Sequence, residues 1–229
     1  MCLLVILLCS YLIVFQTSIS ISLLRREMFR PFSQNIPLPS GVTANLSNPL
    51  LYNLANTTVV RIPCGEGHLA GWYLSAATCP VTVLYLHGRS QNRGWGHRVG
   101  IYRVLQNMGY CVLAVDYRGF GDSSPIEIHE GTVVEDAVIA HAYLKKVYKP
   151  QKILIWGHSL GAPVAAHCAA EHSDDGDGVQ RYLVLESAFD NMQHLVVEGG
   201  LPEWQQMGIM MVGLQAADLA FRLESSPNS

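Results

Sequence analysis

Charged residues are scarce in this sequence, and neither sign is in large excess. Lysine and arginine together number 15, aspartate and glutamate number 18, and the formal net charge is -3. Proteins that bind nucleic acid present a basic patch or stripe that neutralises phosphates. Because this sequence has no basic excess, we expect no nucleic-acid partner.

Metal-ligand clusters and a disulfide framework are also lacking. No group of histidine, cysteine, aspartate and glutamate has the spacing of a metal site, so we expect no metal and no cofactor. Six cysteines are too few for a disulfide framework in a chain of 229 residues. Cys111 and Cys168 are expected to be small buried side chains. Cys64 and Cys79 flank a predicted hairpin and are a candidate pair in an oxidising compartment.

The first 24 residues contain no charged side chain. Residues 2–15 are almost wholly apolar, weaker hydrophobicity follows, and three arginines close the segment: Arg25, Arg26 and Arg30. The whole stretch is long enough to cross a bilayer, although its strongest part is closer in length to a signal-peptide core. No lysine or arginine precedes the run, and no A-x-A cleavage site follows it. We therefore interpret residues 1–24 as a transmembrane anchor, with a cleaved signal peptide and a buried core helix as alternatives.

Two signals disagree about the side of the membrane on which the rest of the chain lies. The arginines after the apolar run favour the cytosol by the positive-inside rule. Two N-x-[ST] glycosylation acceptors, Asn45 and Asn56, favour the lumen. We expect a lumenal domain. Residues 25–56, rich in proline, asparagine and serine, are predicted to be a linker or a loosely packed lead-in, and residues 57–229 a partial α/β domain.

After the linker, apolar runs alternate with segments of helical periodicity. The pattern predicts a hairpin first, followed by buried strands that alternate with helices. The predicted strands are 57–63, 69–75, 81–86, 111–115, 153–156 and 182–185, and the predicted helices are 100–108, 133–148, one that starts near 161, 191–198 and 201–223. This order predicts an α/β fold with a doubly wound, mostly parallel sheet and an antiparallel hairpin at one edge.

The sequence Gly157-His158-Ser159-Leu160-Gly161 lies where a buried strand is followed by a helix rich in small residues. Strand, tight turn and helix are the context in which G-x-S-x-G forms a nucleophile elbow. The serine must adopt a strained backbone conformation there, and the flanking glycines leave room for the turn. We therefore predict that Ser159 is a catalytic nucleophile.

A serine nucleophile of this kind also needs an oxyanion hole. One donor is the backbone N–H of the residue after the nucleophile, which is Leu160 here. The second comes from the loop after the strand at 81–86, which begins His87-Gly88-Arg89. Gly88 would let the backbone approach the site, and the N–H of Arg89 would be the donor.

Five motifs occur in one order along the chain: LYLHG at 84–88, GHRV at 96–99, DYRGFGDS at 116–123, WGHSLG at 156–161 and LESAF at 185–189. With these motifs the sequence resembles the membrane-anchored α/β-hydrolase-domain lipases that act on lysophosphatidylserine and monoacylglycerols. The resemblance covers about residues 57–225. It implies an α/β-hydrolase fold, a lipid ester substrate, and a single-pass protein of the endoplasmic reticulum membrane with a lumenal catalytic domain.

Several polar residues inside these motifs are assigned structural roles. We expect Asp116 and Arg118 to organise the loop after their strand, with Arg118 bound to nearby carbonyls. His97 and Arg98 are also expected to be structural, and the side chain of His158 is expected to point away from the nucleophile.

The family's triad continues with an acid and then a histidine after later strands. Here about 40 residues follow the strand at 182–185, so the last two strands are expected to be missing, together with that acid and histidine. Three interpretations remain open. The chain is a truncated form of an active lipase, or it is a short isoform or degenerate paralogue that is catalytically inert and acts as a membrane-anchored binding protein. In the third, Asp190 or Glu186 and His194 form a variant triad.

Overall fold

The computed structural model describes residues 35–37, 43–65, 67–172 and 176–188. The predicted anchor at 1–24 and the predicted helices at 191–198 and 201–223 lie outside these ranges. Within them, no helix is both long enough and apolar enough to cross a bilayer.

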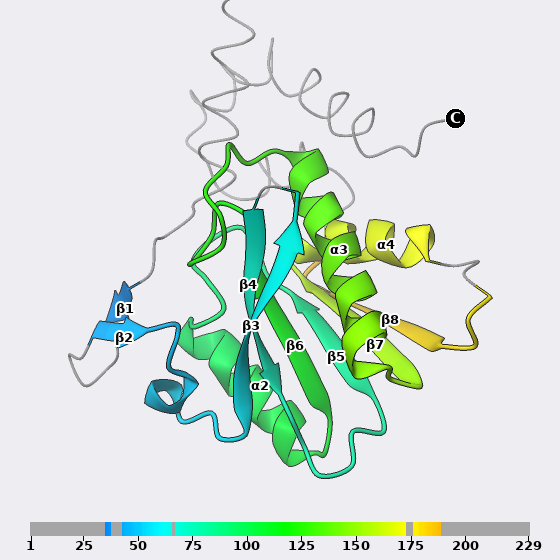
Figure 1. Cartoon of the computed structure of the whole chain (residues 1–229), viewed down its shortest axis with the longest axis horizontal. Coiled ribbons are helices and arrows are strands. Elements are labelled where there is room, and N and C mark those ends of the chain that lie inside the picture. Colours follow the sequence, from blue (N-terminus) through cyan, green and yellow to red (C-terminus); the bar gives the residue numbers. More distant parts are fainter. Residues whose placement is uncertain (1–34, 38–42, 66, 173–175, 189–229) are drawn as a thin grey trace, which may run out of the picture. The chain divides into compact units, whose positions relative to one another are not determined.

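Six strands form one mixed sheet in the order β3-β4-β6-β5-β7-β8 (Figure 1). Their bounds are β3 Thr57–Cys64, β4 Gly67–Leu74, β5 Thr82–Leu86, β6 Cys111–Asp116, β7 Lys152–His158 and β8 Gln180–Glu186. The β3–β4 hairpin pairs antiparallel with itself and with β6, and the remaining pairs are parallel. The predicted α/β class and the antiparallel hairpin at the edge are thus confirmed.

Three helices connect the strands of this sheet: α2 Gly96–Asn107, α3 Glu130–Tyr148 and α4 Gly161–Glu171. Helices α2 and α3 begin three or four residues earlier than the periodicity indicates. For α3 the reason is a reciprocal cap, in which the ring of His129 accepts from the backbone of Thr132 and the hydroxyl of Thr132 accepts from the backbone of His129. This capping box gives no signal in the sequence, because histidine is not a usual N-cap residue.

Strand β5 shows how the sheet is buried on both faces. All five of its residues are buried, and successive side chains alternate between the faces. Val83 and Tyr85 pack in a cluster with Tyr102 and Leu105 of α2. Leu84 and Leu86 therefore face the opposite side. Such a strand is typical of a parallel sheet with helices on both faces.

The part of the predicted linker that precedes β3 is packed against the domain. It contains β2 Thr43–Asn45, paired with β1 Asn35–Pro37, and a short 3₁₀ helix, η1 Pro49–Tyr52. Leu46, Tyr52 and Leu54 belong to the buried cluster on the α2 side, and the indole N–H of Trp72 donates to the carbonyl of Leu46 over 2.8 Å. This packing gives no clear signal in the sequence, because isolated apolar residues in a loop show no periodicity.

The cysteine pairing differs from the prediction. Cys79 and Cys111 form a disulfide with their Cα atoms 5.1 Å apart, whereas Cys64 is buried and free. The candidate pair Cys64–Cys79 is therefore not formed, and Cys111 is buried, as expected, but paired. The reason is topological: β6 pairs with β5, so the start of β6 lies beside the loop that leads into β5. Cys168 is buried and free, as expected.

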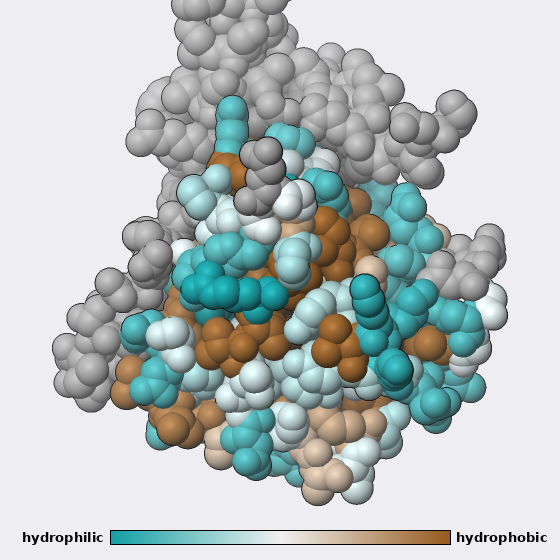
Figure 2. Space-filling model, in the orientation of Figure 1, coloured by the Kyte–Doolittle hydropathy of each residue, from teal (hydrophilic) through white to brown (hydrophobic). Residues whose placement is uncertain are grey.

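Strand β8 is the edge strand of the described sheet on the side opposite the hairpin. Its large apolar side chains are 43–48% exposed, at Tyr182, Leu183 and Leu185. On the face of the molecule viewed in Figure 2, hydrophilic and hydrophobic residues are interspersed. The expected loss of the last two strands of the fold concerns residues after 188, so it stays a prediction.

Candidate active site

Ser159 lies at the sharp turn between β7, which ends at His158, and α4, which begins at Gly161. Its φ angle is +53°, in the left-handed region that a residue with a side chain rarely adopts. Such a conformation costs about 1–3 kcal/mol and persists only where the surroundings enforce it. Two backbone hydrogen bonds do so here, because the N–H of Ser159 donates to the carbonyl of Glu186 over 2.8 Å and its carbonyl accepts from Ala162 over 2.9 Å.

The two glycines of the motif are required by close backbone contacts. A Cβ atom on Gly157 would lie 2.0 Å from the carbonyl oxygen of Gly161. A Cβ atom on Gly161 would lie 2.0 Å from the carbonyl oxygen of Leu86, at the end of β5. Both distances are far below van der Waals contact. The turn can therefore close after β7 and pack against the end of β5 only when both positions lack a side chain.

The loop after β5 lies against this turn, as predicted from the sequence. A Cβ atom on Gly88 would lie 3.3 Å from the Cβ of Ser159 and 3.1 Å from Nδ1 of His158. Gly88 therefore lets the loop approach the serine closely. Leu160, whose N–H is one predicted oxyanion donor, is 1% exposed and is the N-cap of α4, while Arg89 is exposed at the start of the loop.

A buried charge network lies behind the loop. The carboxylate of Asp116 accepts from the backbone N–H and from the guanidinium of Arg93, each over 2.6 Å, and it lies 3.3 Å from Nε2 of His87. All three side chains are fully buried. Burial alone would raise the pKa of Asp116, but the Arg93 guanidinium holds it below its usual value. Burial, with a contribution from Arg98, lowers the pKa of His87, so its ring is neutral near pH 7.

Arg98 is the second buried arginine of this region, with 1% of its surface exposed. From α2 it donates to the carbonyls of Asn92 over 2.7 Å, Ser90 over 2.6 Å and Gly88 over 3.3 Å. The structural role expected for Arg98 is therefore a specific one, because it holds the loop that carries Arg89. The burial of Arg93 was not predictable, since a lone arginine in a loop gives no signal of burial.

Arg118 is bound differently from the expectation. Its partners are carboxylates of α3 rather than carbonyls, with Asp136 at 2.6 Å and Glu135 as the second partner. Burial raises the pKa of Asp136 to about 6, although Arg118 opposes the shift. Because this cluster links the loop after β6 to α3, the structural role expected for Arg118 holds with a different set of acceptors.

No base for the serine is found within the described ranges. No hydrogen bond joins the hydroxyl of Ser159 to a histidine or carboxylate there. Glu186 accepts the indole N–H of Trp156 over 2.9 Å. The ring of His158 lies 6.0 Å from that of His97, and partial burial lowers the pKa of His158. Asp190 and His194 lie outside the described residues, and no group that could hold a metal ion occurs inside them.

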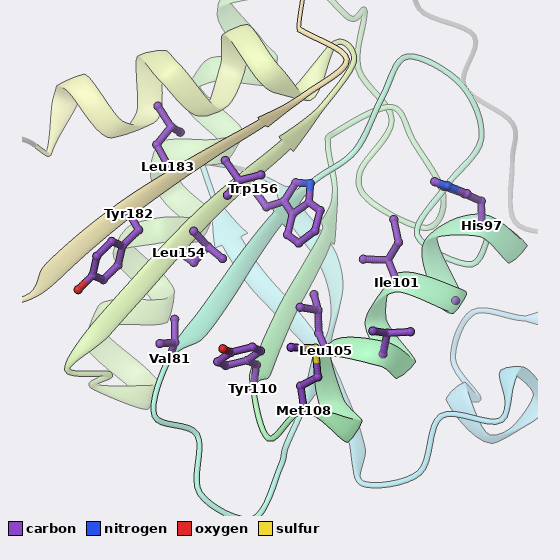
Figure 3. Close-up of a pocket in the computed structure, with 13 residues that line it drawn as sticks. Val81, His97, Ile101, Leu105, Met108, Tyr110, Leu154, Trp156, Tyr182 and Leu183 are labelled. Carbon is purple, nitrogen blue, oxygen red and sulfur yellow. The ribbon is translucent and has the colours of Figure 1, made fainter.

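A cavity of about 950 Å³ lies between α2 and the strands β7 and β8 (Figure 3). Side chains of α2, such as Ile101 and Leu105, face Leu154 and Trp156 of β7 across it. Ser159 is not among the lining residues. The cavity is therefore an apolar groove on one face of the sheet, separate from the nucleophile.

Comparison with known proteins identifies the fold family to which this strand order and turn belong. The alpha/beta hydrolase fold family matches residues 81–206. Lysophosphatidylserine lipase ABHD12 of Danio rerio is 40% identical over 126 residues, which is 54% of this chain and 32% of that protein. The chain thus spans about a third of the length of this curated relative.

Two solved structures have the same fold. The Pyrococcus furiosus esterase Pf2001 aligns with a TM-score of 0.57 and 25% identity over 80% of this chain and 67% of its own. An alpha-beta hydrolase from Vibrio vulnificus aligns with a TM-score of 0.64 and 20% identity over 86% and 76% of the two chains. The elbow geometry, the strand order and these matches lead to one conclusion: the chain belongs to the alpha/beta hydrolase fold family, which confirms the resemblance seen in its motifs.

Proposed function

We propose that this chain carries the nucleophile and the oxyanion hole of a serine hydrolase that cleaves lipid esters at a membrane. The observation that carries the proposal is the backbone of Ser159, held at a φ of +53° with Gly88 packed against its Cβ. That conformation is strained, and the backbone hydrogen bonds with Glu186 and Ala162 enforce it. Strain of this kind is typical of a residue positioned for chemistry.

The proposed reaction forms an acyl-enzyme on Ser159. The serine oxygen attacks the ester carbonyl while its proton passes to a base, and the carbonyl oxygen becomes an oxyanion. Backbone N–H groups of Leu160 and Arg89 receive that oxyanion; one such donor contributes about 3–4 kcal/mol. The alcohol then leaves with the proton, and water releases the fatty acid in a second step.

The base must come from outside the described ranges. Without a base, a serine with an oxyanion hole retains only about 10³–10⁴-fold acceleration over water. Relatives that are named lysophosphatidylserine lipases favour lysophosphatidylserine as the substrate. Other lysophospholipids and monoacylglycerols share the single acyl ester that the reaction requires.

Release of fatty acid from defined lipids tests this function. The full chain, purified in detergent micelles, should release oleate from lysophosphatidylserine or from monooleoylglycerol, and the Ser159→Ala chain should release none above background. Equal release by the two chains would refute Ser159 as the nucleophile. No release by the wild-type chain from either lipid would favour a catalytically inert, membrane-anchored binding protein.

We also propose a single-pass protein of the endoplasmic reticulum membrane with this domain in the lumen. The apolar segment at 1–24 supports the anchor. The Cys79–Cys111 disulfide supports an oxidising compartment. Asn45 and Asn56, the acceptors of the two N-x-[ST] triplets, are exposed. In cells, endoglycosidase should increase the gel mobility of the chain, and the Asn45→Gln, Asn56→Gln double variant should show no change; an unglycosylated wild-type chain would contradict the lumenal placement.

A further inference from the structure

The carbonyl group of Gly88 accepts two hydrogen bonds inside the domain. A carbonyl can only accept, so Nδ1 of His87 carries the proton and donates to it over 2.7 Å. Nη2 of Arg98 donates to the same oxygen over 3.3 Å. Both donors are fully buried, and Gly88 itself is buried beside Ser159. This carbonyl is therefore fixed from the interior of the protein.

The orientation of this carbonyl determines the orientation of the next N–H. The carbonyl of Gly88 and the N–H of Arg89 belong to one peptide unit, which is planar and trans. In such a unit the two groups point in opposite directions. When His87 and Arg98 hold the carbonyl toward the interior, the N–H of Arg89 is turned away from them. We propose that Arg98, assisted by His87, is a positioning residue that aims the N–H of Arg89 at the oxyanion.

The geometry of Arg98 suits this role better than a simple charge would. Its planar guanidinium reaches three carbonyls of the loop, at Gly88, Ser90 and Asn92. The guanidinium carbon also lies 5.3 Å from the ring centre of Trp95, which restricts it from another side. A lysine presents a compact ammonium on a flexible stem and cannot reproduce this fork. The loop is thereby ordered before any substrate arrives.

This role rests on the proposed function, because an oxyanion donor matters only if Ser159 forms a tetrahedral adduct. Preorganised donors stabilise the transition state more than the bound substrate, so their loss lowers kcat and leaves KM nearly unchanged. Deleting one oxyanion donor costs about 10²–10³-fold in kcat. A donor that is present but released from its orientation should cost less, about 10–100-fold.

Two measurements on the full chain in detergent test the role of Arg98. The first is turnover of p-nitrophenyl butyrate by the wild type, Arg98→Met, Arg98→Lys and Ser159→Ala. Arg103→Met is the matched control, because Arg103 lies on the same helix and donates to the carbonyl of Tyr52 over 3.1 Å, away from the loop. We expect Arg98→Met to lower kcat 10–100-fold with KM within twofold, Arg98→Lys to recover part of the loss, and Arg103→Met to match the wild type.

The second measurement does not depend on turnover. In chains labelled with ¹⁵N-arginine, the backbone amide resonance of Arg89, assigned by its loss in Arg89→Lys, should shift in Arg98→Met and stay in place in Arg103→Met. If the Arg89 amide resonance does not shift in Arg98→Met, the positioning role is overturned. The role is also overturned if Arg98→Met keeps the wild-type kcat while Ser159→Ala abolishes turnover. Turnover that survives Ser159→Ala refutes the proposed function instead, and the amide resonance then decides the role of Arg98 alone.

Discussion

Substitution of Gly161 by alanine tests whether the elbow is as tightly confined as the structure indicates. The added Cβ would lie 2.0 Å from the carbonyl oxygen of Leu86 and 3.0 Å from that of His87. Both atoms belong to the backbone at the end of β5, so neither can rotate away. Relief requires a displacement of about 1 Å or more between the start of α4 and the end of β5. Overpacking of this kind costs about 1–3 kcal/mol.

The expected loss of stability is measurable by thermal unfolding. At about 2–4 °C per kcal/mol for a chain of this size, Gly161→Ala should lower the Tm by about 2–12 °C. A misplacement of about 1 Å at a reacting atom costs about 10²-fold in rate, so reaction at Ser159 should fall by about that factor.

Gly100 provides a matched control for this substitution. It lies inside α2, and an added Cβ would meet no atom within 4 Å. Gly100→Ala should therefore stabilise the chain by about 0.8–1 kcal/mol through helix propensity alone. If Gly161→Ala unfolds at the same temperature as Gly100→Ala, the elbow is not confined as described, and the steric argument for the motif fails.

Two further predictions concern the interior of the domain. Asp116→Asn leaves the buried Arg93 with less compensation and should lower the free energy of unfolding by about 3 kcal/mol. Folding lowers the pKa of Asp116, so its ionised form stabilises the protein above the unfolded-state pKa of about 4, and this stability is lost as the pH falls further. In urea titrations between pH 3 and 7, the free energy of unfolding of Asp116→Asn should therefore depend less on pH than that of the wild type. Cys79→Ser should lower the free energy of unfolding by about 2–4 kcal/mol, because it removes the disulfide with Cys111. Maleimide should then label one more thiol in the denatured, unreduced variant than in the wild type, and that thiol is Cys111. Labelling of Cys111 in the wild type would refute the pairing.

The sequence predicted most of the sheet because its strands are buried on both faces. Runs such as 81–86 and 111–115 contain almost no polar residue, and a parallel sheet between two helix layers requires this. The elbow was predictable for a related reason. Its two glycines are fixed by contacts of 2.0 Å, so a local steric requirement is visible as a local motif.

The supporting residues were harder to predict because their partners are distant in the sequence. Arg93 and Asp116 are 23 residues apart, and nothing in either segment indicates that both are buried. The Cys79–Cys111 disulfide is not visible in the sequence for the same reason, since the neighbour of Cys79 is set by the pairing of β5 with β6. Arg98 was recognised only as a structural residue, because its function depends on the direction of three carbonyls.

Covalent labelling of Ser159 is the most direct test of the central claim. The full chain, in detergent, is treated with a fluorophosphonate, and the modified residue is located by peptide mass spectrometry. Our account predicts one adduct, on Ser159, that is absent from Ser159→Ala and at least tenfold slower to form in Gly161→Ala. A wild-type chain that remains unlabelled, or one that is labelled elsewhere at the same rate in all three chains, would contradict it.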